Sequence, residues 1–436
     1  MALKRNYLLD FFKGVAAFGV VLVHFQFPDI TGKVLCSVGV AGVILFYLIS
    51  GYFAYSDDDE KACRNLLKRF KRNLIITLTA VLVYFIFALV REIIAGSFGE
   101  WIMKFTDPVL YFRMFVMGDF EVIHGDPLWF MPALLYAYLI LYCVHKFRLK
   151  KAAYIAMPFL LLLRIGMETY TNSFGADWHL SGNFIVGALP VMLLGHFIAS
   201  RKDKFTSKPV SVTAVCCILS TLLMFVFVNV KIGDFDISQP FKIWCALSVF
   251  ILALKLPEKK VCAPIGVLGD RYSLYIYLWH FLIGVIIKDI LIANNAPEWV
   301  IDWCLPVIVI IVSTAVSAAI YHIKGAVRKD TPPAEKNNDS PKPDESDKTV
   351  ARVTEMESRL NRLNRWLSEG GELTDAVRGD AKALDEYLRS GLWRSDFEAD
   401  EAGRLPSDLP RGVLSEDAAY NALTEFDKRV NGENHV

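Results

Sequence analysis

The chain has 436 residues, of which 54% are hydrophobic and 21% are charged, and its mean hydropathy is +0.36. This composition is too apolar for a single soluble core, and a formal net charge of +1 disfavours a nucleic-acid-binding protein with a basic footprint. The charges are unevenly spread: residues 1–330 carry 32 Lys and Arg against 23 Asp and Glu, whereas residues 350–436 carry 12 against 18. We therefore expect a basic, apolar part followed by a separate acidic part.

Apolar runs of about 20 residues, the length with which a helix crosses a bilayer, recur throughout residues 1–330. They predict an all-α fold, a polytopic membrane bundle of about ten transmembrane helices. The eight cysteines lie mostly inside these runs and never as C-x-x-C, so we expect neither a disulfide framework nor a metal site. The runs span residues 8–27, 34–55, 74–95, 127–147, 152–170, 183–200, 211–230, 238–256, 267–291 and 300–323.

Lysine and arginine in the loops predict the orientation, because basic loops are retained in the cytoplasm. The second, fourth, sixth and eighth runs are each followed by a basic loop, and the alternate loops carry acids such as Glu100, Asp126 and Asp177. The start of the chain is basic as well, with Lys4 and Arg5. An even number of spans with both termini in the cytoplasm places every basic loop on the cytoplasmic side. We therefore expect a multi-pass protein of the cell membrane.

The first run contains three ionisable residues, Asp10, Lys13 and His24. Such residues are costly inside a membrane helix and are therefore candidates for function. Lys13 and His24 are eleven residues apart, which places them on one face of a helix and about 16 Å apart along its axis. Structural roles stay open, because Asp10 and Lys13 could pair or snorkel and His24 could be an interfacial histidine.

The loop after the second run, KACRNLLKRFKRN, contains six bases. Arg69 and Arg72 lie three residues apart on one helical face and could bind the phosphates of a cytosolic donor. Cytoplasmic retention and the binding of anionic lipid headgroups explain the same bases without any substrate. The sequence alone leaves both interpretations open.

Later segments contain further candidates. The outer segment 98–126 is aromatic and amphipathic, which predicts a helix in the membrane interface. Arg164 lies deep in the fifth run and must face the bundle or a wet cavity, with either Glu168 or a substrate as its partner. The ninth run carries Arg271 near its inner end and His280 near mid-depth. His280 stands among aromatic residues, where a packing role and a functional role are both open.

The sequence changes character after the last run. Residues 331–349 contain four prolines and no large apolar residue, which predicts an unfolded linker. From residue 350 the apolar residues return at helical spacing, which predicts a small helical cytosolic domain over residues 350–436. The predicted organisation is thus a membrane domain, 1–330, a linker, 331–349, and this domain. The residues that show the helical spacing are Met356, Leu360, Leu363 and Leu367.

The first run, within RNYLLDFFKGVAAFGVVLVHF, resembles the opening motif of the acyltransferase 3 family of integral-membrane proteins. Arg5, Asp10, Gly14 and His24 match that motif, whereas Lys13 stands where the family usually has Arg. The positive charge is kept, but the bidentate fork of Arg is lost. The resemblance continues over about residues 6–323. Its later motifs are FYLISGYF with Ser50, RFKR with Arg69 and Arg72, PLWFMPALL with Trp129, and YSLYIYLWH with Tyr272, Ser273, Tyr275 and His280.

This resemblance implies an enzyme that O-acylates an extracytoplasmic glycan, such as a bacterial cell-envelope polysaccharide, or a related molecule. The co-substrate would be cytosolic acyl-coenzyme A, mostly acetyl-coenzyme A in this family, with no bound cofactor. The expected partners are membrane lipid and a glycan or small hydroxyl-bearing acceptor, with no nucleic acid.

The resemblance also implies roles for the candidate residues. His24 would be the general base or a transient acyl carrier, since imidazole is competent for both. The expected catalytic set is His24, Lys13 and His280. The donor would be bound by Arg69, Arg72 and Arg271. Structural or substrate support would come from Asp10, Ser50, Trp129 and Arg164.

Two other functions stay open. Similar membrane modules occur fused to amino-acid racemases, which suggests a transporter or flippase for a small solute or glycan without acyl transfer. The second is a degenerate module that only anchors the protein or recruits a partner through its acidic tail. The segment from Trp393 to Tyr420 resembles a small bacterial family of unknown function and adds no chemistry.

Overall fold

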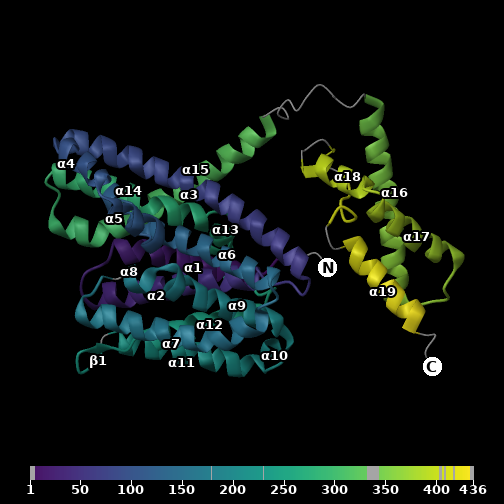
Figure 1. Ribbon diagram of the computed structural model, residues 1–436, viewed down its shortest axis with the longest axis horizontal. Coiled ribbons are helices and arrows are strands. Elements are labelled where there is room, and N and C mark those ends of the chain that lie inside the picture. Colours follow the sequence, from purple (N-terminus) through teal and green to yellow (C-terminus); the bar gives the residue numbers. More distant parts are fainter. Residues whose placement is uncertain are drawn as a thin grey trace. The chain divides into compact units, whose positions relative to one another are not determined.

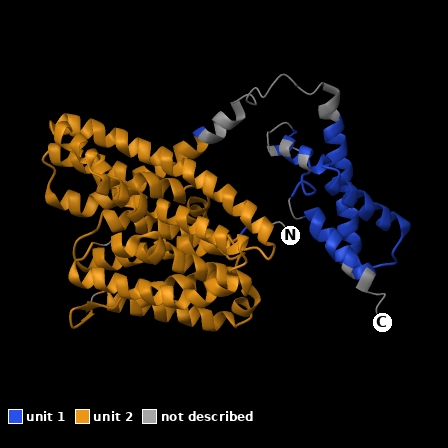
Figure 2. Cartoon of the chain, in the orientation of Figure 1, with its two compact units in different colours: residues 1–5, 323–436 blue, residues 6–322 orange. Residues whose placement is uncertain are grey.

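The computed structural model describes residues 5–177, 179–228, 230–330, 343–401, 405–406, 409–415 and 418–432. Over these residues the chain forms nineteen α-helices and one two-stranded hairpin (Figure 1). The predicted all-α fold is confirmed. The chain divides into two compact units, residues 6–322 and residues 323–436 with residues 1–5 (Figure 2).

Eight helical segments among the described residues are long and apolar enough to cross a membrane. They correspond to eight of the ten predicted runs, and the other two runs form shorter helices, Phe184–Ser200 and α12 (Gln239–Lys255). The predicted polytopic bundle is confirmed. The eight segments are α1 (Tyr7–His24), α2 (Asp29–Tyr52), α3 (Asp59–Ala95), η4 with α6 (Asp126–Trp129 and Phe130–Lys146), α7 (Lys150–Phe174), α11 (Val210–Phe227), α14 (Ser273–Ala293), and η6 (Val300–Cys304) with the start of α15 (Leu305–Asp330).

Shorter elements connect these helices. The hairpin strands β1 and β2 pair antiparallel, with Lys231 opposite Asp236. The connecting elements after α7 are α8 (His179–Gly182), η5 (Phe184–Ala188), α9 (Leu189–Ser200), α10 (Lys202–Thr206), β1 (Lys231–Ile232), β2 (Phe235–Asp236) and α13 (Ala263–Arg271).

Helix α1 packs closely against α2 and α13 because glycines remove side chains at the contacts. A Cβ on Gly39 of α2 would lie 2.2 Å from the carbonyl oxygen of Gly19 in α1. A Cβ on Gly14 of α1 would lie 2.3 Å from the carbonyl oxygen of Ile265 in α13. Such distances leave no room for any side chain. The Gly14 of the opening motif is therefore explained by the approach of α13 to α1.

The ninth predicted span, residues 267–291, is not one helix. The chain breaks at Tyr272, with α13 before it and α14 after it. α13 packs on α1 where Gly269 meets the backbone of Asp10, and the hydroxyl of Ser273 donates to the carbonyl of Gly269 at 2.8 Å. The hydropathy of the segment is continuous and no proline marks the break, so the sequence alone predicted a single helix.

The single interfacial helix predicted for residues 98–126 is also wrong, because several short helical turns occupy this segment. The side chain of Asp107 accepts the N–H of Val109 and starts a new helix at Pro108. Gly118, at φ +77°, ends the next turn, and a Cβ there would lie 3.2 Å from the α-carbon of Trp129. The turns are α4 (Phe98–Met103), η1 (Lys104–Thr106), α5 (Pro108–Phe112), η2 (Arg113–Met117) and η3 (Glu121–Ile123).

The second unit has its own apolar core. Leu360 and Leu363, two of the residues with helical spacing, are 2% and 0% exposed there, and Met356 and Leu367 pack against them. Asp380, which is buried, accepts hydrogen bonds from Arg359 and Arg362. The helices are α16 (Pro343–Glu369), α17 (Asp375–Arg389), α18 (Leu392–Glu401) and α19 (Ala418–Gly432).

The predicted linker and the second unit overlap at residues 343–349. Residues 331–342 lie outside the described residues, but α16 already begins at Pro343. The sequence PDESDKT has a proline and three acids, residue types that are favoured in the first turn of a helix. Helical structure therefore starts seven residues before the predicted boundary at residue 350.

Candidate active site

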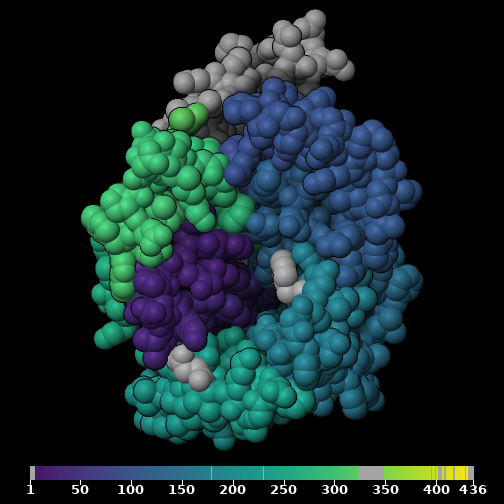
Figure 3. All heavy atoms as spheres, turned by 90° about the vertical axis from the view of Figure 1, so that its left-hand side faces the viewer, coloured from purple at the N-terminus to yellow at the C-terminus, as the bar shows by residue number. Residues whose placement is uncertain are grey.

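Two cavities in the first unit contain most of the predicted site residues. The larger one, which we name the His24 cavity, has a volume of about 450 Å³. Figure 3 looks onto the face that carries α4 and α8, and this face is hollowed beside the N-terminal helices. The cavity is lined by Val20, Val23, His24, Val40, Val43, Asp126, Pro127, Trp129, Arg164, Glu168, Asn172, Ser181, Gly182 and Tyr277.

The smaller cavity, which we name the Lys13 cavity, has a volume of about 230 Å³. It brings together three cations, Lys13 from α1 and Arg69 and Arg72 from α3. Neither arginine has a carboxylate partner among the residues that the structure describes. The other lining residues are Phe46, Ile49, Ser50, Phe53, Asn73, Phe130, Leu134, Tyr138, Ser273, Leu274 and Tyr277.

Tyr277 of α14 lines both cavities and forms part of the wall between them. Its hydroxyl donates to the carbonyl of Pro127, which lies on the His24 side. Its ring lies 5.1 Å from that of Phe130, which lines the Lys13 cavity. One aromatic side chain therefore contacts both cavities.

His24 and His280 lie together although they are far apart in the sequence. Their ring centroids are 5.3 Å apart. His280 is 0% exposed, and its Nδ1 lies 3.0 Å and 2.8 Å from the carbonyl oxygens of Ile276 and Tyr277. Because both partners are acceptors, Nδ1 carries the proton. Nε2 of His280 is then an acceptor, and it has no hydrogen-bond partner in the described structure.

The structure tests the two pairings that the sequence left open. Lys13 Nζ lies 3.4 Å from Asp10 Oδ1, so the pair at the start of α1 forms. Arg164 Nη2 lies 3.4 Å from Glu168 Oε2, as expected for a structural partner one turn away. Nη1 of Arg164 donates to the carbonyl of Gly187 at 2.6 Å. Arg164 also lines the His24 cavity, so its structural role does not remove it from the site.

The remaining predicted residues divide between the cavities, except for one. Ser50 lines the Lys13 cavity and Trp129 lines the His24 cavity. Arg271 lines neither of these two cavities. It is exposed in the last turn of α13, with its guanidinium carbon 5.9 Å from the ring centroid of Tyr321. Arg271 is the last residue of α13, directly before the break at Tyr272.

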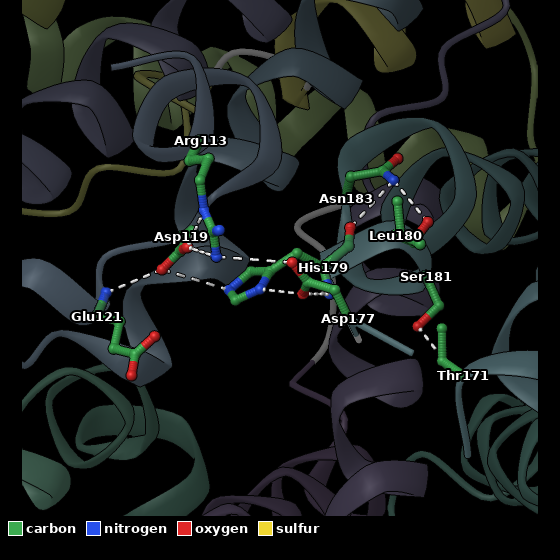
Figure 4. Close-up of polar contacts among 9 residues, drawn as sticks. All are labelled: Arg113, Asp119, Glu121, Thr171, Asp177, His179, Leu180, Ser181 and Asn183. Carbon is green, nitrogen blue, oxygen red and sulfur yellow. Dashed lines mark hydrogen bonds and ion pairs between the residues drawn. The ribbon is translucent and has the colours of Figure 1, made fainter. Parts of the chain in front are cut away.

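A polar cluster near the His24 cavity was not predicted. Figure 4 shows Arg113, Asp119, Asp177 and His179 directed towards one another. Arg113 Nε lies 2.7 Å from Asp119, and His179 Nδ1 lies 2.7 Å from Asp177. Ser181, two residues further on, lines the cavity and lies 3.3 Å from the hydroxyl of Thr171. The only sequence signal for this cluster was the acidity of the alternate loops.

The charge state of Asp177 follows from its neighbours. Burial acts to raise the pKa of Asp177, but hydrogen bonds from the backbone N–H and the ring of His179 outweigh it. The pKa of Asp177 therefore lies below its ordinary value. Asp177 is thus ionised at neutral pH, and Arg113 Nη2 lies 3.6 Å from its carboxylate.

A second unpredicted cluster lies where α3, α6, α7 and α9 meet. His145 Nδ1 lies 2.7 Å from Asp59, and its Nε2 lies 2.8 Å from Nε2 of His196. The hydroxyl of Tyr154 lies 2.8 Å from the other ring nitrogen of His196. Both histidines are 0% exposed. The chain of hydrogen bonds ties four helices together, and none of its members lines either cavity.

Comparison with known proteins gives the family. The acyltransferase 3 model, described as an acyltransferase domain, matches residues 6–322, and a domain of unknown function, DUF4298, matches residues 353–431. No curated protein and no solved structure matches the chain. No group of three or more metal-ligating side chains occurs within the described ranges. The family match covers most of the chain and includes both cavities, and both resemblances seen in the sequence are confirmed. The chain therefore belongs to the acyltransferase 3 family and is a multi-pass membrane O-acyltransferase.

Proposed function

We propose that this acyltransferase moves an acyl group, most simply acetyl, from cytosolic acyl-coenzyme A to a hydroxyl of an extracytoplasmic glycan or related acceptor. The observation that carries the proposal is the pair of cavities with one shared wall. One cavity holds three cations, the other is lined by His24, whose ring lies 5.3 Å from that of His280, and Tyr277 lines both cavities. This arrangement suits a reaction whose anionic donor and whose acceptor enter from opposite sides.

The Lys13 cavity is the proposed donor site. Coenzyme A carries phosphates, and the guanidinium groups of Arg69 and Arg72 suit bidentate phosphate binding. Lys13 contributes a compact charge further along the path, held by its contact with Asp10 at 3.4 Å. The loop bases favour the cytoplasm for this end of the bundle, with both termini on the same side of the cell membrane. Arg271 is absent from this cavity's lining, so we leave it out of the donor site.

His24 is the proposed base. Its imidazole takes the proton of the acceptor hydroxyl as the oxygen attacks the thioester carbonyl. The new C–O bond forms, the C–S bond breaks, and the departing thiolate of coenzyme A takes the proton back from His24. The same residue could instead carry the acyl group between the two substrates. Both routes place the thioester beside His24, past Tyr277.

His280 is the proposed positioning residue. Its Nδ1 is held by two backbone carbonyls of α14, so the ring is fixed and Nε2 remains an acceptor. A fixed acceptor near His24 selects one tautomer of that ring and stabilises the imidazolium formed during attack. A ring-centroid distance of 5.3 Å allows this interaction with a small rotation of either ring.

An assay with labelled acetyl-coenzyme A tests this proposal. Membranes that contain the wild-type protein should transfer label to an endogenous acceptor, and His24→Ala should abolish the transfer. His322→Ala is the matched control, because His322 is exposed on α15 and lines neither cavity. Undiminished transfer by His24→Ala would contradict the proposal. Solute uptake by proteoliposomes without acyl-coenzyme A would instead support the transporter alternative.

A further inference from the structure

One part of the His24 cavity is not used by the proposed chemistry. It is lined by Asp126, Arg164 and Glu168, together with the polar side chains of Asn172 and Ser181. These residues come from the turn before α6, from α7 and from α8. A cavity of about 450 Å³ with a polar wall of this kind can hold a substrate of the size of one sugar ring.

The positive charge of this wall is already neutralised. Arg164 is 5% exposed, and its two terminal nitrogens contact Glu168 and the carbonyl of Gly187. Its buried Nε has no hydrogen-bond partner in the described structure. Because Glu168 matches its charge, Arg164 offers an approaching anion no net attraction.

Asp126 provides negative charge that is not neutralised. Its carboxylate makes no ion pair or hydrogen bond with the residues that the structure describes, and its side chain lines the cavity. The titratable neighbours that act on Asp126 are the acids Glu121 and Asp119 and the histidines His124 and His179. The amide of Asn172 in the lining donates to Asp236 at 3.1 Å. Among the lining residues, two carboxylates, Asp126 and Glu168, stand against one guanidinium, Arg164.

We propose that the His24 cavity selects its acceptor by charge: it takes a neutral polyhydroxylated or a cationic amino-bearing group and rejects an anionic one. Asp126 is the specificity-determining residue, accepting hydrogen bonds from acceptor hydroxyls or pairing with an ammonium group. Carboxylated or phosphorylated sugars would meet an uncompensated carboxylate in a confined space, where like charges repel strongly. This inference rests on the proposed function, since it assigns the acceptor side of the same site.

The charge of the cavity can be measured without knowing the acceptor. Val40→Cys places a thiol on α2 inside the cavity, where none of the lining residues is a cysteine. The detergent-solubilised full chain is treated with trimethylammonioethyl or sulfonatoethyl methanethiosulfonate, and the rate at residue 40 is followed by site-resolved mass spectrometry. We expect the cationic reagent to be favoured over the anionic one, relative to a free thiol, by roughly tenfold.

Variants then assign the selectivity. Adding Asp126→Asn should reduce the preference by roughly threefold or more, whereas adding Glu100→Gln should not, because Glu100 is an exposed acid in α4 that does not line the cavity. Equal rates for both reagents, or a preference that Asp126→Asn leaves unchanged, would overturn the proposal. Oligogalacturonate acting as a better acetyl acceptor than neutral chito-oligosaccharide would overturn it as well. Absence of acyl transfer with the thiol selectivity intact would contradict the proposed function and leave the charge selection standing.

Discussion

The imidazole of His280 lies with its centroid 5.3 Å from that of His24, and its Nδ1 is fixed by the carbonyls of Ile276 and Tyr277. Tyr277, whose carbonyl anchors His280, is thus also the residue whose side chain separates the two cavities. The histidine pair and the wall are therefore built on the same turn of α14. A change in that turn should affect both acyl transfer and the separation of the substrates.

His280→Phe should keep the turn packed and remove the acceptor near His24. We expect the kcat for acyl transfer to fall by about 10²-fold, as for loss of one group that stabilises charge in the transition state, with little change in the KM for acetyl-coenzyme A. The pH dependence of kcat should shift as well, because the tautomer of His24 is no longer selected. An unchanged kcat and an unchanged pH profile would show that His280 only fills space.

Arg72→Gln should weaken donor binding. Loss of a charge-assisted hydrogen bond to phosphate costs about 1.5–3 kcal/mol, so the KM for acetyl-coenzyme A should rise by about 10- to 100-fold. Lys71→Gln is the control, since Lys71 is an exposed neighbour that does not line the cavity. Both variants should be compared at two salt concentrations. Equal KM values for the two variants would assign the basic loop to membrane orientation alone.

Tyr277→Ala should open the wall between the cavities. Water and donor would then meet without an acceptor, so we expect faster hydrolysis of acetyl-coenzyme A and less transfer to acceptor. Tyr277→Phe keeps the ring and loses only the hydrogen bond to Pro127, which should cost about 1 kcal/mol or less. Release of coenzyme A, measured with a thiol reagent, distinguishes the outcomes. Low hydrolysis by Tyr277→Ala would contradict the assigned wall.

The second unit should lose stability in acid through Asp380. Hydrogen bonds from Arg362 and Arg359 lower the pKa of Asp380 below its ordinary value despite its burial. The stabilisation is therefore complete above the unfolded-state pKa, about 3.9, and is lost as the pH falls through the lower folded-state pKa. Hydrogen exchange of α16 and α17 in the full chain should show this loss. If α16 and α17 of Asp380→Asn lose protection from hydrogen exchange in the same pH range as the wild type, the assignment of this pH dependence to Asp380 is wrong.

The second buried cluster should contribute to the stability of the membrane unit. Tyr154→Phe removes the hydroxyl that lies 2.8 Å from His196, at a cost of about 1 kcal/mol in the free energy of unfolding. Tyr170→Phe is the matched control, because Tyr170 lies on the same helix and is 50% exposed. Thermal unfolding in detergent checks both. Equal stability of the two variants would show that the hydrogen bond is not needed.

The sequence predicted what local patterns determine. Hydropathy and length located the helices, and the spacing along α1 placed Lys13 and His24 on one face, where each now lines a cavity. The break at Tyr272 was missed because it arises from packing of α13 on α1 and leaves the hydropathy unchanged. Arg271, which ends α13 at this break, lines neither of the two cavities.

Contacts between distant segments could not be predicted from one sequence. His24 and His280 meet only because α1 and α14 pack together, and Arg113 meets Asp177 only because the segment before α6 approaches the segment after α7. Asp126 was visible as one acid among many, and only the cavity gives it a role. The family resemblance named the candidate site residues, and contacts between distant segments bring them together in the structure.

Mass spectrometry of surface glycans tests the central claim most directly. Cells that produce the wild-type protein or His24→Ala at equal levels are compared with cells that lack it. The account predicts an acyl group, with the mass of one acetyl, on the glycan of wild-type cells and its absence in both other strains. Equal acylation in the wild-type and His24→Ala strains would contradict the assignment of His24 as the residue at which acyl transfer occurs.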